Sequence, residues 1–335
     1  MSDRGPARPA RPGRGRSQTP GPLQIAVLGV GLIGGSIGLA VRSRLGAHVR
    51  GCDPDPRALA RALELGAIDR ACEEVPAAVD DADYVFVATP VAVSVQAARA
   101  ALDAAGPGCV VSDVGSTKRQ IARAIEDPRF VPGHPLAGAE TAGVRGARED
   151  LFDGAVWYLA PSAPQEAGAL ARMDSLVAEL GARPVVLSPD AHDRLMASVS
   201  HLPHVLANVL VAQALRAAPP WDDPRAAGAL GVNPSFRDAT RVAGANTPVW
   251  TDIYMANADL LAEAIDEAIQ ELSGVRDALD AEDAQAIAAW NERAREQRER
   301  LSCGPARLGR GAPSPNLSDA REEAPPARAP SPPDP

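Results

Sequence analysis

Between residues 23 and 187 the chain alternates short apolar runs with longer amphipathic ones. The apolar runs predict strands, and the order in which they occur is Leu23–Gly29, His48–Asp53, Tyr84–Ala88, Cys109–Asp113, Phe130–His134, Trp157–Ala160 and Arg183–Leu187. The intervening runs predict helices at Leu32–Leu45, Pro56–Leu65, Val91–Ala104 and Thr117–Glu126. Strands that alternate with helices in this way predict an α/β fold with a doubly wound parallel sheet.

The pattern changes after Pro189, where no further strand is expected. Three long, Ala-rich runs with helical periodicity follow, at His192–Leu215, Trp250–Ala278 and Ala281–Leu301. We therefore expect a domain over residues 23–188 that contains the sheet, and an all-α domain over residues 189–302. Residues 1–22 are rich in Arg and Pro, and residues 303–335 are rich in Pro. Both ends lack apolar periodicity, so we expect them to be disordered.

Composition narrows the possible classes of protein. The chain has 335 residues, which on length alone allows about two domains of roughly 150 residues each. No apolar run is expected to reach the ~18–20 residues of a membrane span, and the N-terminal arm lacks the apolar core of a signal peptide. Four scattered cysteines without a CxxC pair suggest neither a zinc site nor disulfides, which fits a cytoplasmic protein. The net charge of −9 argues against a nucleic-acid partner.

The first chemical motif is a glycine-rich turn after the first expected strand. It reads Gly29-Val30-Gly31-Leu32-Ile33-Gly34 and opens a helix, and Asp53 lies 19 residues after Gly34 at the end of the next strand. This context is typical of a Rossmann-type dinucleotide site, because the glycines let the backbone approach a pyrophosphate at a helix N-terminus. Asp53 is expected to bind ribose hydroxyls, which favours NAD over NADP. The alternative is that Asp53 only forms the turn before Pro54.

Loops after three later strands are expected to converge on the same crevice, since ligands of open parallel sheets bind at the carboxyl ends of the strands. Lys118, the only lysine in the chain, lies in one of these loops, where it either serves the site or merely begins a helix. With the glycine turn, these loops complete the predicted cofactor-binding set. That set is Gly29, Gly31, Leu32, Ile33, Gly34, Asp53, Thr89, Pro90, Asp113 and Gly115.

Histidines also cluster around the candidate site. Four of the five histidines are expected near it, namely His134, His192, His201 and His204, and the exception is His48. His201 and His204 are three residues apart and should share one side of a helix if Pro203 is tolerated. They are expected to bind substrate; a structural helix–helix contact is the alternative. No further Cys or acid completes a metal-binding pattern, so no metal is expected.

Arg241 is a candidate for binding a carboxylate, because a guanidinium offers two parallel charged hydrogen bonds. The alternative from spacing alone is a surface arginine paired with Asp238.

Taken together, six segments of the chain resemble prephenate/arogenate dehydrogenases, the family that acts in tyrosine biosynthesis. The segments are GVGLIGGS (29–36), ATP (88–90), SDVGSTK (112–118), GHPLAGAE (133–140), SHLPH (200–204) and FRDATRVAG (236–244). The resemblance covers about residues 23–300 in the order expected for the family. It implies a nucleotide-binding domain followed by a helical dimerisation domain, and NAD-dependent oxidative decarboxylation of prephenate to 4-hydroxyphenylpyruvate.

The resemblance also implies roles for individual residues. His134 would be the catalytic histidine that contacts the 4-hydroxyl of the substrate, with Ser116 beside it. Arg241 would hold a substrate carboxylate, and His201 and His204 would shape the side-chain pocket. The remaining residues carried over are two acids of a gating network with Arg241 and an aromatic residue near the entrance: Glu140, Asp238 and Trp250. We expect a cytoplasmic homodimer with a small-molecule substrate.

Three alternatives stay open at this point. Arogenate differs from prephenate by an amine in place of a keto group, and no residue of the chain distinguishes the two. A different dehydrogenase of small hydroxy acids could share the glycine turn and Arg241, although it would not require the 112–118 and 133–140 segments. A non-catalytic NAD-sensing protein could use the helical half as a dimer surface, although intact His134, Ser116 and Arg241 argue against it.

Overall fold

The computed structural model describes residues 21–139, 141, 143–161, 168–217 and 233–302. Contacts between residues divide the chain into two compact units, Met1–Ala268 and Ile269–Pro335. The boundary falls inside helix α11 (Ala258–Asp280). Two predicted segments lie outside the described residues: the N-terminal arm, except for its last two residues, and the whole C-terminal tail, residues 303–335.

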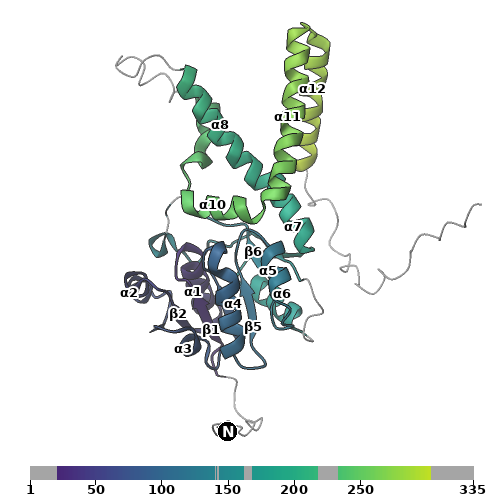
Figure 1. Ribbon diagram of the computed structural model, residues 1–335. Coiled ribbons are helices and arrows are strands. Elements are labelled where there is room, and N and C mark those ends of the chain that lie inside the picture. The colour runs from purple at the N-terminus through teal and green to yellow at the C-terminus, as the bar shows by residue number, and fades with distance from the viewer. Residues whose placement is uncertain (1–20, 140, 142, 162–167, 218–232, 303–335) are drawn as a thin grey trace, which may run out of the picture. The chain divides into compact units, whose positions relative to one another are not determined.

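A five-stranded parallel sheet forms the centre of the first unit (Figure 1). Its strand order is β3-β2-β1-β4-β5, so the order reverses between β1 and β4. The crevice beside such a reversal is where open α/β sheets bind their ligands. The strands are β1 (Gln24–Leu28), β2 (His48–Cys52), β3 (Arg70–Cys72), β4 (Tyr84–Val87) and β5 (Val110–Asp113).

Helices cover both faces of this sheet, as the alternation of β1 side chains requires. Ile25 and Val27 belong to one apolar cluster, which includes residues of α1, while Ala26 and Leu28 belong to the other, which includes residues of α3 and α4. Both faces of β1 are therefore buried, which is the pattern expected of a parallel sheet. The helices are α1 (Leu32–Leu45), α2 (Pro56–Glu64), α3 (Val75–Val79), α4 (Val91–Ala104) and α5 (Arg119–Ala124).

A second, three-stranded sheet continues from β5. An isolated bridge joins Val111 to Phe130, and the chain then enters β6 (Gly133–Pro135). β6 pairs antiparallel with β7 (Val156–Leu159), which pairs parallel with β8 (Arg183–Val186). The short η1 (Val144–Gly146) and the helix α6 (Ala169–Glu179) complete this part of the fold.

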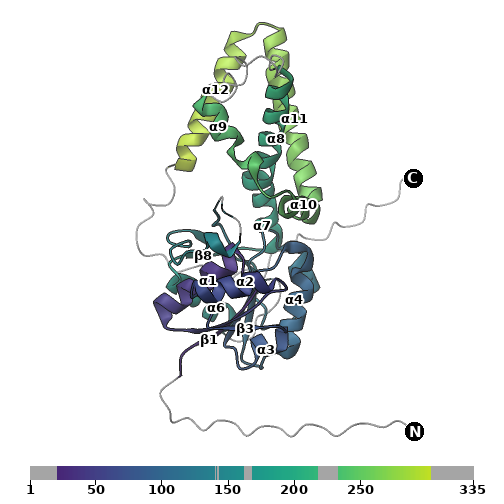
Figure 2. The same ribbon diagram turned by 90° about the vertical axis from the view of Figure 1, so that its left-hand side faces the viewer.

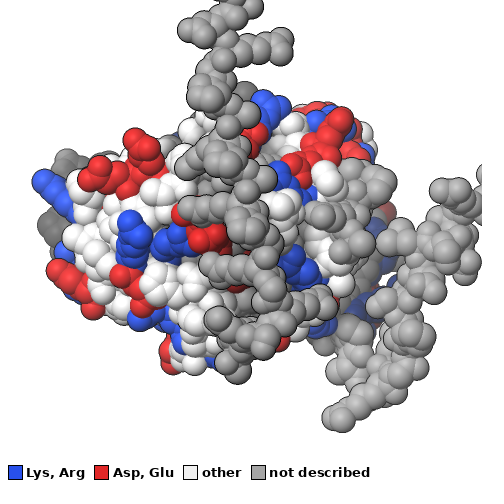
Figure 3. Space-filling model, turned by 90° about the horizontal axis from the view of Figure 1, so that it is seen from below, with Lys and Arg blue, Asp and Glu red and all other residues white. Residues whose placement is uncertain are grey.

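The predicted fold class is confirmed, and most elements lie within two residues of their predicted bounds. Six elements were not predicted: β3, α3, η1, α6 and, later in the chain, α9 (Pro234–Thr240) and η3 (Arg241–Gly244). The strand predicted at Phe130–His134 is instead a single bridge at Phe130 followed by β6. Pro132 explains the break, because proline has no N–H to donate to a neighbouring strand. On the face seen in Figure 3, acidic and basic side chains are intermingled rather than separated into patches.

After β8 the described residues contain helices only, as expected. The single helix predicted at His192–Leu215 is three consecutive pieces: α7 (Pro189–Met196), a π-helical turn η2 (Ala197–His201) and α8 (Leu202–Ala217). Pro203 accounts for the irregular turn, because it cannot donate the i→i−4 hydrogen bond and its ring crowds the preceding turn. The chain continues through α9 (Pro234–Thr240), η3 (Arg241–Gly244) and α10 (Thr247–Ala256) to α11 (Figure 2).

The expectation that no run is long and apolar enough to span a membrane is wrong for one stretch. The helical run Pro189–Ala217 has 29 residues and reaches a mean hydropathy of 1.5 over 18 of them. By length and composition alone it could cross a membrane. A single such helix is weak evidence, since core helices of proteins that never enter a membrane have the same properties.

The described part of the second unit consists of the C-terminal part of α11, a turn at residues 281–283 and α12 (Ala284–Ser302). None of its described residues is buried. Apolar side chains are instead exposed along it, including Ile269, Leu272 and Leu279. A helical segment without a fully buried side chain has little of the packing that normally stabilises helices in water.

Candidate active site

The glycine turn lies between the end of β1 and the start of α1, beside the reversal of strand order. Gly29 has φ +92°, and a Cβ there would lie 2.5 Å from the carbonyl oxygen of Ala88. A Cβ on Gly34 would overlap the carbonyl oxygen of Gly29. Gly31 differs, because no atom lies within 4 Å of the position its Cβ would take. Two of the glycines therefore permit the fold, and the third leaves open space at the N-terminus of α1.

Asp53 ties the glycine turn to the end of β2. Its Oδ2 accepts a hydrogen bond from the backbone N–H of Val30 at 2.9 Å, and its Oδ1 accepts one from Asp55 N–H at 2.9 Å. The second hydrogen bond stabilises the turn at Pro54, so Asp53 also has the turn-forming role that was the alternative for this residue. A carboxylate has about four acceptor positions, so these two bonds leave others for a ligand.

Thr89 follows β4, directly across the reversal from the glycine turn. Its Oγ1 is buried and has no hydrogen-bond partner among the residues that the structure describes. Pro90 comes next and precedes α4, while Leu32 and Ile33 lie half-buried at the start of α1. A buried hydroxyl without a partner is costly unless a ligand or water satisfies it, so its position marks a place for a polar group.

Lys118 holds the ends of β5 and β6 together from inside the protein. Its side chain is fully buried, and Nζ donates to Oδ2 of Asp113 and, at 2.7 Å, to the carbonyl oxygen of Gly133. Asp113 also accepts hydrogen bonds from Gly115 N–H at 2.9 Å and from Gly133 N–H at 3.2 Å. Burial lowers the pKa of Lys118, while the charge of Asp113 opposes that change. The single lysine thus fixes the backbone on which His134 sits.

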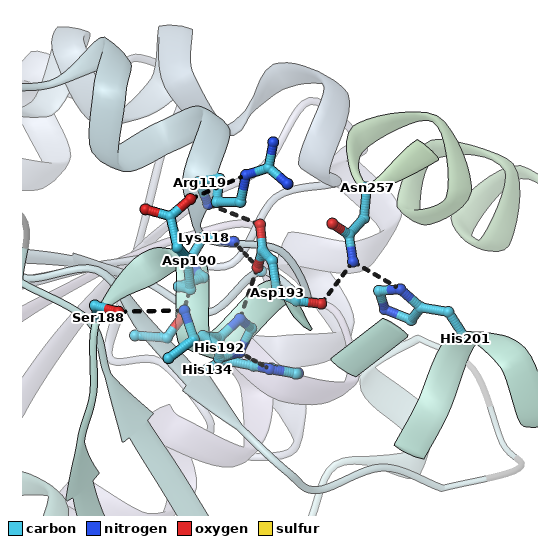
Figure 4. A network of polar contacts seen from close by, with 12 residues as sticks. Lys118, Arg119, His134, Ser188, Asp190, His192, Asp193, His201 and Asn257 are labelled. Atoms are coloured by element: carbon cyan, nitrogen blue, oxygen red, sulfur yellow. Dashed lines mark hydrogen bonds and ion pairs between the residues drawn. The ribbon is translucent and has the colours of Figure 1, made fainter. Parts of the chain in front are cut away.

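His134 lies on β6, directly after the residue that Lys118 holds. Its Nδ1 is 2.8 Å from Nε2 of His192, and Nδ1 of His192 is 2.7 Å from Oδ1 of Asp193 (Figure 4). His192 and Asp193 are fully buried, and His134 is 8% exposed. The three side chains form a continuous line of hydrogen bonds that ends at the most exposed member, His134.

Both histidines of this line are held in the neutral form. Burial lowers the pKa of His134 well below its ordinary value of 6.5, and His192, Lys118 and His201 lower it further by charge repulsion. Burial also lowers the pKa of His192, although the hydrogen bond that His192 donates to Asp193 works in the opposite direction. At neutral pH each ring therefore carries a proton on one nitrogen and a lone pair on the other.

Asp193 connects this line to two other segments. Its carboxylate accepts the backbone N–H of Lys118 at 2.7 Å and of Arg119 at 2.9 Å, at the start of α5. Its carbonyl oxygen accepts a hydrogen bond from Nδ2 of Asn257 at 2.8 Å, and the same amide lies 3.2 Å from Nδ1 of His201. One residue thus joins the loop after β5, the helix α7 and the junction of α10 with α11.

A group of aromatic rings lies next to His201. His204 stacks on Trp250 with ring centroids 3.8 Å apart and planes 4° from parallel, and its Nδ1 hydrogen-bonds with the hydroxyl of Tyr254. His201 meets Trp250 edge-on at 6.3 Å. Burial lowers the pKa of His201 to about 4. The two histidines of the SHLPH segment therefore contact the same tryptophan, so they share one side of the helical run, which is what their spacing predicted.

The other candidate residues are more dispersed. Arg241 and Asp238 are exposed on η3 and α9, which pack against α8, and the backbone of the next residue, Val242, approaches the ring of His204. Ser116 is half-buried in the loop before Lys118. Glu140 lies outside the described residues. Within the described ranges, no group of three or more His, Cys, Asp or Glu side chains is arranged to hold a metal ion.

Sequence reasoning missed three residues of this network: Asp193, Asn257 and Tyr254. It grouped His192 with the other histidines but gave it no role. The dipeptide His192-Asp193 near the start of a helical run was the available signal for part of the network. No local pattern marks Asn257, whose side-chain hydrogen bonds are with residues more than fifty positions away.

The chain matches two family models in succession. The nucleotide-binding domain of prephenate dehydrogenase matches residues 37–186, and the dimerization domain of prephenate dehydrogenase matches residues 188–292. A prephenate dehydrogenase of Bacillus subtilis is 32% identical over 284 residues, which cover 83% of this chain and 76% of that protein.

Two solved structures resemble the fold. A prephenate dehydrogenase of A. aeolicus, crystallised with hydroxyphenyl propionate and NAD⁺, has a TM-score of 0.77 at 24% identity and covers 85% of this chain and 100% of its own. An arogenate dehydrogenase of Synechocystis has a TM-score of 0.71 at 26% identity and covers 83% of this chain and 99% of its own. The two solved structures agree in fold, and the paired family models and the Bacillus subtilis relative show that the chain belongs to the prephenate dehydrogenase family of oxidoreductases.

Proposed function

We propose that the protein is an NAD-dependent prephenate dehydrogenase, which oxidises and decarboxylates prephenate to 4-hydroxyphenylpyruvate. The observation that carries the proposal is the neutral His134 on β6, close to the crevice end of β5 and backed by His192 and Asp193. A buried neutral imidazole can accept the proton of a substrate hydroxyl, which is what oxidation of an alcohol requires.

The residues present fit NAD. The open space at Gly31 and the N-terminus of α1 suit a pyrophosphate, and the unpartnered hydroxyl of Thr89 suits a polar group of the cofactor. We assign Gly29, Gly31, Leu32, Ile33 and Gly34 to the pyrophosphate turn, Asp53 to the ribose, and Thr89, Pro90 and Gly115 to the crevice. Asp113 was predicted to belong to this set, but it is 1% exposed and bonded to Lys118, so we propose that it supports the backbone instead.

The chemistry needs little besides alignment and one proton acceptor. NAD, when bound, supplies the acceptor for the hydride that leaves C4 of the substrate. His134 accepts the proton of the 4-hydroxyl as the carbon–oxygen bond gains double-bond character, and Ser116 lies in the adjacent loop. The electron pair of the breaking bond to CO₂ enters the ring, which becomes aromatic. His134 then returns the proton to the oxygen, so that the products are 4-hydroxyphenylpyruvate, CO₂ and NADH.

We propose that the helical side binds the rest of the substrate. Arg241 would pair with a carboxylate, His201 and His204 would line the side-chain pocket, and Trp250 would close one wall, since His204 already stacks on it. Asp238 and Glu140 would form the charged surroundings of Arg241. Arg241 lies one residue before Val242, whose backbone approaches His204, which supports a shared pocket.

Arogenate is the second candidate substrate, favoured by the likeness to the Synechocystis arogenate dehydrogenase. The two substrates are distinguished by steady-state rates with prephenate and arogenate, each with NAD and with NADP. The proposal expects NADH, CO₂ and 4-hydroxyphenylpyruvate from prephenate. If no NADH forms from prephenate, the proposal is wrong.

We also propose a cytoplasmic homodimer. The second unit buries none of its described residues, and apolar side chains are exposed on η2–α8 as well, at Val199, Leu206, Val209, Leu210 and Leu215. A second copy would cover these surfaces, in agreement with the dimerization domain that matches residues 188–292. The apolar run 189–217 is then an interface helix, and its Asp193 and His201 tie it to the rest of the protein. Light scattering on the purified protein should give twice the chain mass of 34.7 kDa.

A further inference from the structure

The line from Asp193 through His192 to His134 has one consistent assignment of protons. Oδ1 of Asp193 also accepts the backbone N–H of Lys118, so this oxygen acts as an acceptor, as an ionised carboxylate must. Nδ1 of His192, at 2.7 Å, therefore donates to it. In neutral His192 the proton on Nδ1 leaves Nε2 with a lone pair, and Nε2 accepts a hydrogen bond.

The same logic extends to the next ring. His134 Nδ1 lies 2.8 Å from Nε2 of His192, so it must be the donor of that bond. In neutral His134 the proton on Nδ1 leaves the lone pair on Nε2. An isolated imidazole side chain has no fixed preference for carrying its proton on Nδ1. In this protein His192 and Asp193 impose that preference on His134.

We propose that His192 and Asp193 are positioning residues that hold His134 in the tautomer with Nδ1 protonated, so that Nε2 is the atom that accepts the substrate's hydroxyl proton. The inference rests on the proposed dehydrogenase activity and adds to it the identity of the accepting atom and the residues that select it. Neither His192 nor Asp193 is assigned to touch the substrate.

The line also offers a place for the positive charge that the reaction creates. When Nε2 of His134 takes the hydroxyl proton, the Nδ1 proton can pass to Nε2 of His192, whose Nδ1–H stays on Asp193. The charge then resides on His192, directly beside a carboxylate. On His134 the charge would be opposed by burial and by Lys118 and His201, with no carboxylate in contact with the ring in the described network.

The charged and titratable groups that face His134 come from four segments. They are Asp113 at the end of β5, Lys118 directly before α5, His192 and Asp193 on α7, and His201 on η2. Lys118 and Asp113 are bonded to each other, so they offset each other in charge. This leaves the Asp193–His192 pair as the element that distinguishes the two nitrogens of His134.

The test compares His192→Gln and His192→Leu with Asp190→Asn as the matched control. The glutamine oxygen can accept the hydrogen bond from His134 Nδ1 but cannot take its proton, while leucine can do neither. Asp190 is an exposed acid on the same helix, with 73% of its side chain accessible. Kinetics with prephenate and NAD, NAD affinity and thermal unfolding are measured for all three variants and the unmodified protein.

We expect kcat to fall about 10- to 100-fold in His192→Leu, the usual effect of removing a group that orients a functional histidine. KM and NAD affinity should stay within about threefold, His192→Gln should recover part of the lost kcat, and Asp190→Asn should match the unmodified protein. Unchanged kcat in His192→Leu would overturn the proposal. A lower kcat together with an equally large rise in KM and loss of NAD affinity, without recovery by Gln, would also overturn it, because these changes indicate a purely structural role.

A second measurement does not depend on whether the His192 variants fold. The nitrogen-15 chemical shifts of the five histidines in the unmodified protein report the tautomer of each ring, and His134→Asn identifies the His134 signals. The proposal requires a protonated Nδ1 and an unprotonated Nε2 on His134 at neutral pH. The opposite tautomer would overturn it even if prephenate is turned over, whereas absence of turnover in the unmodified protein would contradict the proposed function itself.

Discussion

The two sides of the candidate site are built in different ways. The side that we propose binds the cofactor is shaped by the backbone of one short contiguous turn. Close packing requires Gly29 and Gly34, and Gly31 leaves a space open. On the side that we propose accepts the substrate proton, side chains from β5, β6, α7 and the α10–α11 junction meet through hydrogen bonds. The comparison teaches that a backbone-shaped site is encoded locally, while a side-chain network depends on the completed fold.

The largest expected effect is on the proton-accepting side. Replacing His134 by Ala should lower kcat by about 10²- to 10⁴-fold, the usual effect of a positioned general base. NAD affinity should not change, since no cofactor contact is assigned to His134. His134→Asn keeps a polar side chain without basicity, so it should restore substrate binding more than turnover. If the alanine variant keeps most of its kcat and only unfolds at lower temperature, His134 is a structural residue.

The next effect concerns substrate binding. Arg241→Ala should raise KM for prephenate by about ten- to a hundredfold, because a charged hydrogen bond contributes roughly 1.5–3 kcal/mol. NAD binding, measured by fluorescence titration, should be unchanged. Arg237, an exposed arginine one turn earlier on α9, is the matched control and should tolerate Ala. An effect at Arg237 in place of Arg241 would move the carboxylate site.

The glycine turn allows a direct comparison of the two kinds of glycine. Gly34→Ala forces a methyl group against the carbonyl of Gly29 and should cost about 1–3 kcal/mol of unfolding free energy, seen as a lower melting temperature. Gly31→Ala meets no protein atom, so stability should be retained while NAD binds less tightly. Equal loss of NAD affinity without loss of stability in both variants would contradict the separation of their roles.

The smallest expected effect is the choice of cofactor. Asp53 carries a negative charge at the end of β2, so a 2′-phosphate should be disfavoured there. We predict a preference for NAD over NADP of at least tenfold in kcat/KM, which corresponds to about 1.4 kcal/mol. Asp53→Asn should reduce the preference. Equal kcat/KM values for the two cofactors in the unmodified protein would show that Asp53 serves only the turn it makes with Val30 and Asp55.

This contrast also explains what could be predicted from the sequence. Strands and helices with strong periodicity were located closely, and α1 and α4 match their predicted bounds. The three residues of β3 and the five of α3 are too short to show a period. Lys118 was recognised as unusual by being the only lysine, but its burial against Asp113 and Gly133 depends on β5 and β6 lying side by side.

The structure also changes the pH dependence that an ordinary histidine at this position would give. An ordinary histidine titrates near 6.5, which predicts activity that rises between about pH 6 and 7. The structure places the pKa of His134 well below that value because of burial and of the neighbouring His192, Lys118 and His201. A lowered pKa keeps the ring neutral, and therefore able to accept a proton, into more acidic solution.

Stability should respond to the same groups. The pKa values of His134, His192 and His201 are all lowered in the folded protein, to about 4 for His201. Below about pH 6.5 the unfolded chain therefore binds protons that the folded protein does not, and stability falls as the pH decreases from there. Circular dichroism across this range identifies the lowest pH at which activity still reports on folded protein.

The pH dependence of kcat with prephenate and NAD therefore tests the central claim most directly, namely that a neutral, buried His134 accepts the substrate proton. With the protein folded throughout, kcat should be constant from about pH 8 to pH 6.5 and should fall only well below 6.5, as His134 becomes protonated. The residual kcat of His134→Ala should lack this acidic decline. A midpoint at or above 6.5, or the same decline in His134→Ala, would contradict the account.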